Sequence, residues 1–136
     1  MNDRELIKLA LEARKMSYSP YSGFSVGAAL LCKDGSVYTG CNIENSAFSP
    51  TNCAERTAFF KAVSEGKREF EKIAVVGGNS SDIFPENYCP PCGVCRQVMK
   101  EFCFADFKII IAKTPDDFKT LTLAEILPLS FDKREV

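Results

Sequence analysis

The chain has 136 residues, 46% of them hydrophobic and 26% charged, which are ordinary values for a globular protein long enough to bury a core. Its 17 basic and 18 acidic residues leave a net charge of -1 and form no basic stripe, so a nucleic-acid partner is not indicated. No apolar run could span a membrane and the first ten residues lack a signal-peptide core, so we expect a single cytoplasmic domain over residues 1–136.

The first half of the sequence predicts a helix, a hairpin and a second helix. Residues 4–17 carry apolar side chains at helical spacing. Apolar residues at every second position over 24–30 then predict a strand with one buried face. The Lys-Asp-Gly-Ser sequence at 33–36 is a turn signal, and we expect the return strand over 37–41. The second helix should begin at Cys53 and end near Ser64.

The second half predicts a strand, a helix and a further strand, joined by one long loop. A short apolar strand at 73–76 precedes a loop over 79–91 that is rich in Ser, Pro, Asn and Asp. A helix from about 92 to 102 follows, and three consecutive isoleucines within 108–112 indicate a strand that is buried on both faces. We expect a last strand and a short closing helix over residues 118–121 and 122–127.

This order of elements indicates an α/β fold. Helices that alternate with strands after a hairpin produce a mixed sheet covered by helices. The strands at 73–76 and 108–112 are separated by a helix, which is the pattern of a parallel crossover connection. We therefore expect a three-layer α/β/α sandwich around a mixed, mostly parallel sheet of about five strands.

The chain contains seven cysteines and no histidine, which restricts its chemistry. An odd number of cysteines without a secretion signal argues against a disulfide framework. A zinc site would have to rely on cysteine ligands. Catalytic proton transfer would have to use a carboxylate, a lysine, a tyrosine or a cysteine.

Two clusters at predicted helix starts supply three cysteines and one glutamate. Cys92 and Cys95 are three residues apart, so they face the same way on one helix, and Cys53 begins another. Three thiolates leave one tetrahedral position of Zn²⁺ free for water, which is the catalytic arrangement. Glu55 is then available as a proton carrier. A ligand followed two residues later by Glu, and then Pro91-Cys92-x-x-Cys95, matches the signature of zinc deaminases.

Two neighbours of these clusters affect the prediction. Arg56 could donate a hydrogen bond to a thiolate and, with the positive ends of two helices, reduce the negative charge of three thiolates. Cys89 leaves an alternative open, because it could complete a closed structural zinc site with the other three cysteines. We favour the open site because Pro90 biases Cys89 toward an extended conformation outside the helix, and because a closed site gives Glu55 no role.

The chain resembles the small cytidine deaminases of pyrimidine salvage over nearly its whole length. The stretch Asn42-Ile43-Glu44-Asn45 is specific to the nucleoside branch of that fold. The resemblance implies hydrolytic deamination of cytidine and 2'-deoxycytidine to uridine and 2'-deoxyuridine with release of ammonia, by attack of zinc-bound hydroxide at C4 and with Glu55 as the proton shuttle. It is carried by four segments, which are 18–30, 40–45, 53–58 and 91–97.

The resemblance also implies the roles of individual residues and an assembly. One Zn²⁺ per subunit would be held by Cys53, Cys92 and Cys95. The free pyrimidine nucleoside would be bound through its ribose hydroxyls by Asn42 and Glu44, on its ring by Phe24, and at its base edge by the backbone of Ala54. The family is typically a homotetramer whose sites borrow residues from neighbouring subunits, and two phenylalanines match such positions, namely Phe48 and Phe131. The family often has Tyr at position 48 and Ser at position 90, where this chain has Phe48 and Pro90.

Other interpretations stay open. Without the resemblance, Phe24 is equally well a core residue, and Asn42 and Glu44 are turn residues. A deaminase of another amino-heterocycle, such as the nucleoside antibiotic blasticidin S, would use the same metal site, although the Asn42–Asn45 stretch favours a nucleoside. A non-catalytic zinc-stabilised interaction domain would need neither a free zinc position nor Glu55.

Overall fold

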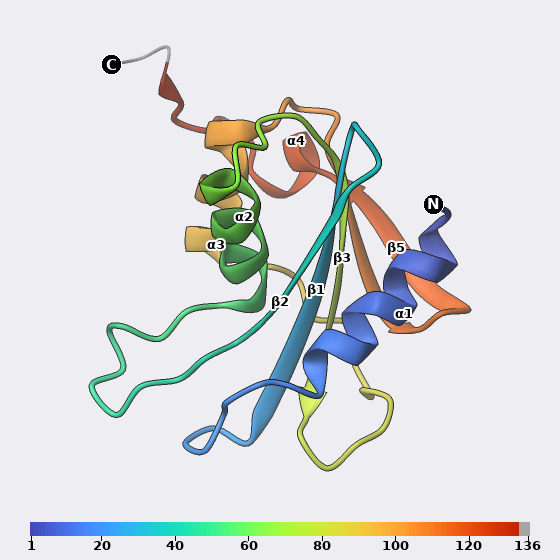
Figure 1. Cartoon of the computed structure of the whole chain (residues 1–136), viewed down its shortest axis with the longest axis vertical. Helices are drawn as coiled ribbons and strands as arrows, with labels where there is room; N and C mark the ends of the chain where they lie inside the picture. Colours follow the sequence, from blue (N-terminus) through green and yellow to red (C-terminus); the bar gives the residue numbers. More distant parts are fainter. Residues whose placement is uncertain (134–136) are drawn as a thin grey trace.

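A computed structural model describes residues 1–133 as one five-stranded sheet with helices on both faces (Figure 1). Within this range the strands lie in the order β2-β1-β3-β4-β5. None of the helices among these residues is long and apolar enough to cross a membrane. The elements in chain order are α1 (Asp3–Arg14), β1 (Phe24–Cys32), β2 (Val37–Cys41), α2 (Ala54–Ser64), β3 (Phe70–Asn79), α3 (Gly93–Phe102), β4 (Lys108–Thr114), β5 (Asp117–Thr122) and α4 (Leu123–Ile126).

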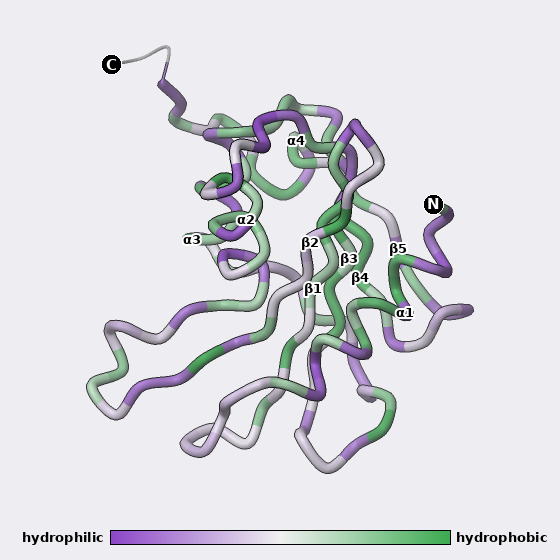
Figure 2. Tube along the Cα trace, in the orientation of Figure 1, coloured by the Kyte–Doolittle hydropathy of each residue, from purple (hydrophilic) through white to green (hydrophobic). Residues whose placement is uncertain are grey.

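Two apolar layers on opposite faces of the sheet form the core, and the predicted three-layer arrangement is confirmed. Helix α1 buries Leu6, Ile7 and Ala10 against one face. Helices α2, α3 and α4 cover the other face, where Phe59 and Met99 are fully buried. Figure 2 shows that the central strands β3 and β4 are hydrophobic and that both ends of the chain are hydrophilic.

The prediction of a mixed sheet with about five strands is confirmed, but the prediction that it is mostly parallel is wrong. Only the β3–β4 pair is parallel among the described residues, and the β1–β2, β1–β3 and β4–β5 pairs are antiparallel. Two of the antiparallel pairs are hairpins, and a short turn can join strands only in that direction. The parallel pair is the one that α3 connects.

Strand β1 is more deeply buried than the sequence predicts, and strand β3 is longer. Strand β1 is buried on both faces rather than one, because α1 covers one face and α2 the other. Strand β3 continues through Gly77 and Gly78, which the sequence places after the strand. A Cβ at Gly77 would lie 2.7 Å from the sulfur of Cys89, and one at Gly78 would lie 2.6 Å from Cβ of Pro85. These glycines let the following loop pack against the strand.

The first helix, α1, ends at Arg14, whereas the sequence predicts that it continues to residue 17.

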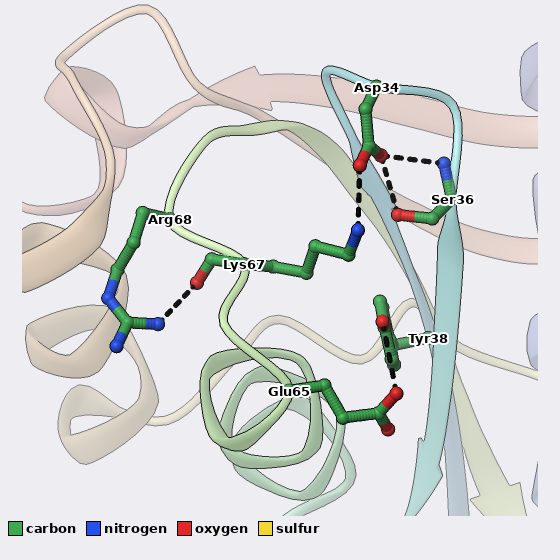
Figure 3. A network of polar contacts seen from close by, with 6 residues as sticks. All are labelled: Asp34, Ser36, Tyr38, Glu65, Lys67 and Arg68. Atoms are coloured by element: carbon green, nitrogen blue, oxygen red, sulfur yellow. Dashed lines mark hydrogen bonds and ion pairs between the residues drawn. The ribbon is translucent and has the colours of Figure 1, made fainter.

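A network of polar contacts fixes the C-terminal end of α2 to the β1–β2 turn (Figure 3). The Lys67 ammonium lies 2.8 Å from the carboxylate of Asp34, which also accepts hydrogen bonds from Ser36. The Tyr38 hydroxyl donates to Glu65 over 3.3 Å. Because this end of the helix is anchored to the hairpin, the N-terminus of α2 lies toward the opposite end of the sheet.

Candidate active site

Three cysteine sulfurs meet where α2 and α3 begin. Cys53 is the N-cap residue of α2, Cys92 is the N-cap residue of α3, and Cys95 lies in the first turn of α3. The sulfur of Cys92 lies 3.7 Å from that of Cys53 and 3.5 Å from that of Cys95. All three sulfurs lie within 4.8 Å of one another, close enough to share one metal ion. Cys95 is buried, Cys53 is half-buried and Cys92 is exposed, so the group is accessible from the side of Cys92.

The segment that leads to Cys92 is fixed on two sides. The carbonyl of Pro91 accepts a hydrogen bond of 2.8 Å from Nε of Arg96, and the same guanidinium donates to the carbonyl of Ile126 over 2.6 Å. Further back, the Tyr88 hydroxyl donates to Asp117 on β5. The start of α3 is therefore held against both α4 and the outer edge of the sheet, which sets the direction in which its two sulfurs point.

Arg56 supplies positive charge to the sulfur group. Its Nη2 donates to the sulfur of Cys53 over 3.2 Å. Burial by itself would lower the pKa of Arg56. Its hydrogen bonds to the Cys53 and Cys95 sulfurs outweigh this effect, so the pKa is raised above its ordinary value. Its Nε is buried without a hydrogen-bond partner among the described residues. A guanidinium in this position suits a site that gathers thiolates.

The pKa values of Cys53 and Cys95 move in opposite directions. The pKa of Cys53 is lowered to about 5, chiefly because its sulfur accepts a hydrogen bond from Cys95 and also one from Arg56, against the effect of burial. The pKa of Cys95 is raised well above its ordinary value by that same hydrogen bond and then by burial. These opposite directions favour one thiolate beside one thiol over two adjacent thiolates, which would repel each other. A divalent cation that prefers soft ligands would displace the protons of both thiols when it binds their sulfurs.

Glu55 lies beside the sulfur group and is almost completely buried, with 4% of its surface exposed. Burial raises the pKa of its carboxyl group to about 7, and the negative charge of Cys53 adds to the shift, against a hydrogen bond from its own backbone that lowers it. A buried carboxyl group without a salt-bridge partner is costly for stability. With a pKa close to neutrality, this carboxyl group next to a candidate metal group can both accept and donate a proton.

Cys89 does not belong to the metal group. Among the described residues, the cluster that could hold a metal consists of Cys53, Cys92 and Cys95. The sulfur of Cys89 instead lies over Gly77 on β3, and burial raises its thiol pKa to about 11. The three-sulfur arrangement, rather than the closed four-cysteine alternative, is the one the structure presents.

Asn42 lies at the end of β2, and its side chain binds the beginning of β1. Its Oδ1 accepts hydrogen bonds from the backbone N–H of Val26, over 2.9 Å, and from the hydroxyl of Ser17. Its Nδ2 donates to the carbonyl of Phe24 over 2.8 Å. The amide is thus held rigidly, and one N–H of its amino group remains available to a ligand.

Glu44 is held by the turn that precedes β1. Its Oε1 accepts the backbone N–H groups of Tyr21 and Ser22 over 3.0 and 3.1 Å, and its Oε2 accepts the Ser22 hydroxyl. These hydrogen bonds, led by that of the Ser22 side chain, lower the pKa of Glu44, so the group is a carboxylate at neutral pH. Glu44 also lines a surface hollow of about 390 Å³ together with Phe48 and Thr51.

The other residues predicted for the site occupy different environments. Ala54 is fully buried at the start of α2, and Phe24 is 42% exposed at the start of β1. Phe48 is 70% exposed and has a φ of 62°, in the left-handed region, and its ring meets the Tyr21 ring edge-on at 6.1 Å. Phe131 is 56% exposed, and its carbonyl accepts a hydrogen bond from Gln97. In this chain Phe48 shares a hollow with Glu44, whereas Phe131 follows α4.

Sequence reasoning missed the partners that orient Asn42 and Glu44. Ser17 and Ser22 lie more than twenty positions away in the chain, and no local pattern connects them to the Asn42–Asn45 stretch. The connection comes from pairing of the chain around Tyr18 with Ile43, an isolated bridge outside the main sheet. Such a pairing leaves no periodic signal in a single sequence.

Residues 1–111 match the protein family described as the cytidine and deoxycytidylate deaminase zinc-binding region. This match covers most of the chain and includes both cysteine clusters. The chain belongs to this family. Its cofactor is zinc, and Cys53, Cys92 and Cys95 form the group that could hold it.

Full-length relatives of this deaminase-family chain agree with the family match. The chain is 48% identical to the cytidine deaminase of Sporosarcina psychrophila, covering 100% of this chain and 96% of that protein. It is 49% identical to the cytidine deaminase of Halalkalibacterium halodurans, and the match covers 100% of this chain and 98% of that protein. The crystal structure of cytidine deaminase from Burkholderia pseudomallei is 41% identical and superposes with a TM-score of 0.88, covering 96% of this chain and 100% of that one.

The geometry predicts which cysteines are needed for zinc. We expect Cys89→Ala to retain wild-type zinc content, because its sulfur lies outside the metal group. We expect Cys92→Ala to weaken zinc binding by more than about 100-fold, since even residues behind the ligands contribute roughly 10- to 100-fold. The measurement is zinc per chain by plasma mass spectrometry after dialysis against a graded chelator. Equal zinc loss in both variants would instead indicate a four-cysteine site.

Proposed function

We propose that the protein catalyses the hydrolytic deamination of cytidine and 2'-deoxycytidine, consuming water and releasing uridine or 2'-deoxyuridine and ammonia. The observation that carries this proposal is the buried carboxyl group of Glu55 beside a three-sulfur group that is accessible through Cys92. The full-length similarity to proteins named cytidine deaminase supports the choice of substrate. The role of the enzyme would be pyrimidine salvage in the cytoplasm.

The residues near the sulfur group divide the chemical work between them. Cys53, Cys92 and Cys95 would hold the zinc ion, which when bound lowers the pKa of water and so supplies a nucleophile at neutral pH. Arg56 compensates the negative charge of the thiolates through its hydrogen bond to Cys53. Glu55 removes a proton from the attacking water and delivers protons to N3 of the pyrimidine and to the departing amino group. Its burial keeps this proton exchange away from bulk solvent.

The nucleoside would be recognised by residues from the beginning of β1, the end of β2 and the start of α2. Glu44 already accepts three hydrogen bonds, and a carboxylate has about four lone-pair sites, so one remains for a ribose hydroxyl. Asn42 can donate its remaining N–H to the other hydroxyl. The half-exposed ring of Phe24 would pack on the pyrimidine, and the backbone of Ala54 would meet the edge of the base.

We also propose that the enzyme works as a homotetramer with sites shared between subunits. The proposal follows from the family, and several large apolar side chains that are exposed in the single chain would be covered in such an assembly. They include Phe60 on α2, Val94 in the first turn of α3, Phe48 and Phe131. In the assembly, Phe48 and Phe131 would contribute to a neighbouring subunit's substrate site.

The assignment of Glu55 predicts a specific loss of activity. We expect Glu55→Gln to retain zinc but to lower kcat for cytidine by at least about 100-fold, because general acid–base catalysis contributes about 10² to 10⁴. The measurement is the decrease in the ultraviolet absorbance of cytidine with zinc-loaded protein. The matched control is Glu65→Gln at the other end of α2, which should behave as wild type.

Other results of this assay would favour the alternative functions. Wild-type protein that binds zinc, leaves cytidine and deoxycytidine unchanged, and deaminates blasticidin S would place the activity on another amino-heterocycle. Zinc-loaded protein that deaminates none of them would be a zinc-stabilised interaction domain.

The assignment of Glu44 to the ribose predicts an effect on substrate binding. We expect Glu44→Gln to raise KM for cytidine by at least about tenfold, because a hydrogen bond to a charged group contributes about 1.5 to 3 kcal/mol. Zinc content should stay at the wild-type value, since Glu44 is not among the metal-group residues. A variant with unchanged KM would show that the ribose is bound elsewhere.

The tetramer proposal predicts the mass in solution. Light scattering coupled to size-exclusion chromatography should give about 60 kDa, four times the 15.1 kDa of one chain. Phe131→Ala should raise KM for cytidine in the assembled protein, because the side chain would be removed from the neighbouring site. An active species of one-chain mass at assay concentration would rule out shared sites.

A further inference from the structure

We infer that Arg14 is a positioning residue for the nucleoside site, holding the beginning of β1 and the start of the loop 80–91 in register with each other. This inference rests on the proposed function, because its consequence for catalysis runs through Phe24 and Asn42. Among the described residues, the side chain of Arg14 donates no hydrogen bond to the sulfur group or to the side chains proposed to bind the nucleoside.

Arg14 is the last residue of α1 and is unusually buried for an arginine, with 7% of its surface exposed. The helix approaches β1 closely at this point, since a Cβ at Gly27 would lie 2.5 Å from the backbone nitrogen of Arg14. Burial lowers the pKa of its guanidinium, against the nearby charge of Asp82. A buried charged group is retained only where its hydrogen bonds compensate for lost water.

The hydrogen bonds of Arg14 go to three backbone carbonyls from separate segments. Nε donates to the carbonyl of Ser25 over 2.8 Å, in β1. Nη2 donates to the carbonyl of Asn79 over 2.7 Å, at the end of β3, and Nη1 donates to that of Asp82 over 2.8 Å, in the loop. The planar fork of the guanidinium therefore sets the relative positions of all three carbonyls.

The Ser25 carbonyl belongs to the segment that Asn42 holds from its other side. The Asn42 side chain binds the carbonyl of Phe24 and the N–H of Val26, the residues on either side of Ser25. Side chains alternate along a strand, so Phe24 and Val26 face the layer that holds α2, while Ser25 faces the layer of α1. Arg14 and Asn42 thus fix the same three residues, which carry the ring proposed to pack on the pyrimidine.

The other two carbonyls lie where the chain leaves the sheet toward the cysteines. Asn79 pairs with Phe24 in the sheet, and the N–H of Ser80 donates to the carbonyl of Gly23 over 2.8 Å. The hydroxyl of Ser80 also lies 2.6 Å from that of Ser25. Removing the guanidinium would take one donor from each of the three carbonyls, of which that of Asn79 would keep the N–H of Asp82 at 3.0 Å. The start of the loop would then be held to β1 by the end of the sheet and the Ser25–Ser80 contact.

The test compares Arg14→Met and Arg14→Lys with Arg68→Met. Arg68 is a matched control, because its guanidinium also donates to two backbone carbonyls, those of Val63 and Lys67, but on the surface near the far end of α2 (Figure 3). Three quantities are measured on zinc-loaded protein: zinc per chain, kcat and KM for cytidine, and hydrogen exchange of peptides that cover residues 18–26 and 80–91.

We expect Arg14→Met to raise KM by about tenfold while kcat stays within about twofold, since a small misplacement of binding groups costs up to about 100-fold. Zinc content should be unchanged, and exchange should quicken in the two segments alone. Arg14→Lys should show a smaller increase in KM, because one ammonium cannot reproduce the geometry of the fork. Arg68→Met should match wild type in all three quantities.

Other results would overturn the inference. A fall in kcat and zinc content with unchanged KM would mean that Arg14 acts through the metal group, and values equal to those of Arg68→Met would mean that it positions nothing. If Arg14→Met does not fold, the same measurements on Arg14→Lys decide. If the wild-type protein leaves cytidine unchanged, the proposed function fails, whereas faster exchange confined to the two segments would still support the positioning role.

Discussion

The fold holds three cysteine sulfurs within 4.8 Å of one another, and the repulsion between thiolates at this distance governs the electrostatics of the site. The pKa of Cys53 is lowered and that of Cys95 is raised by the hydrogen bond between them, so a thiolate at Cys53 disfavours a second thiolate at Cys95. Two helix N-termini and the Arg56 guanidinium reduce the repulsion, but they do not remove it. Zinc held by the three sulfurs would offset this repulsion as well as supply chemistry.

Chain direction explains why binding groups gather at one end of the sheet. Strand β1 begins where β2 and β3 end, because both of its pairings are antiparallel. Helix α2 also begins at this end, since its other terminus is anchored to the β1–β2 turn. Gly77 and Gly78 allow the loop after β3 to lie against the sheet on its way to Cys92. The antiparallel pairs, which contradict the mostly parallel prediction, thus bring the start of β1 to the ends of β2 and β3, and the parallel β3–α3–β4 connection adds the start of α3.

Two buried charged groups occupy the two helical layers. Glu55 begins α2 on one face of the sheet, and Arg14 ends α1 on the other. Neither is compensated by a salt bridge among the described residues. Arg14 is satisfied by three carbonyls, whereas Glu55 lies beside sulfurs and has a raised pKa. Arg14 is therefore suited to holding chain segments in place, and Glu55 is suited to proton transfer.

Local patterns in the sequence predicted the order of the elements and a zinc site, both of which are confirmed, and they also predict Glu55 as the proton carrier. Apolar periodicity locates the helices, and the spacing of Cys53, Glu55, Cys92 and Cys95 follows from helix geometry and zinc coordination. The folded structure adds three features that these patterns do not contain. Cys89 turns toward Gly77, most strand pairs are antiparallel, and Arg14 joins β1 to the loop. These features depend on contacts between residues far apart in the chain, and such contacts leave no periodic trace in a single sequence.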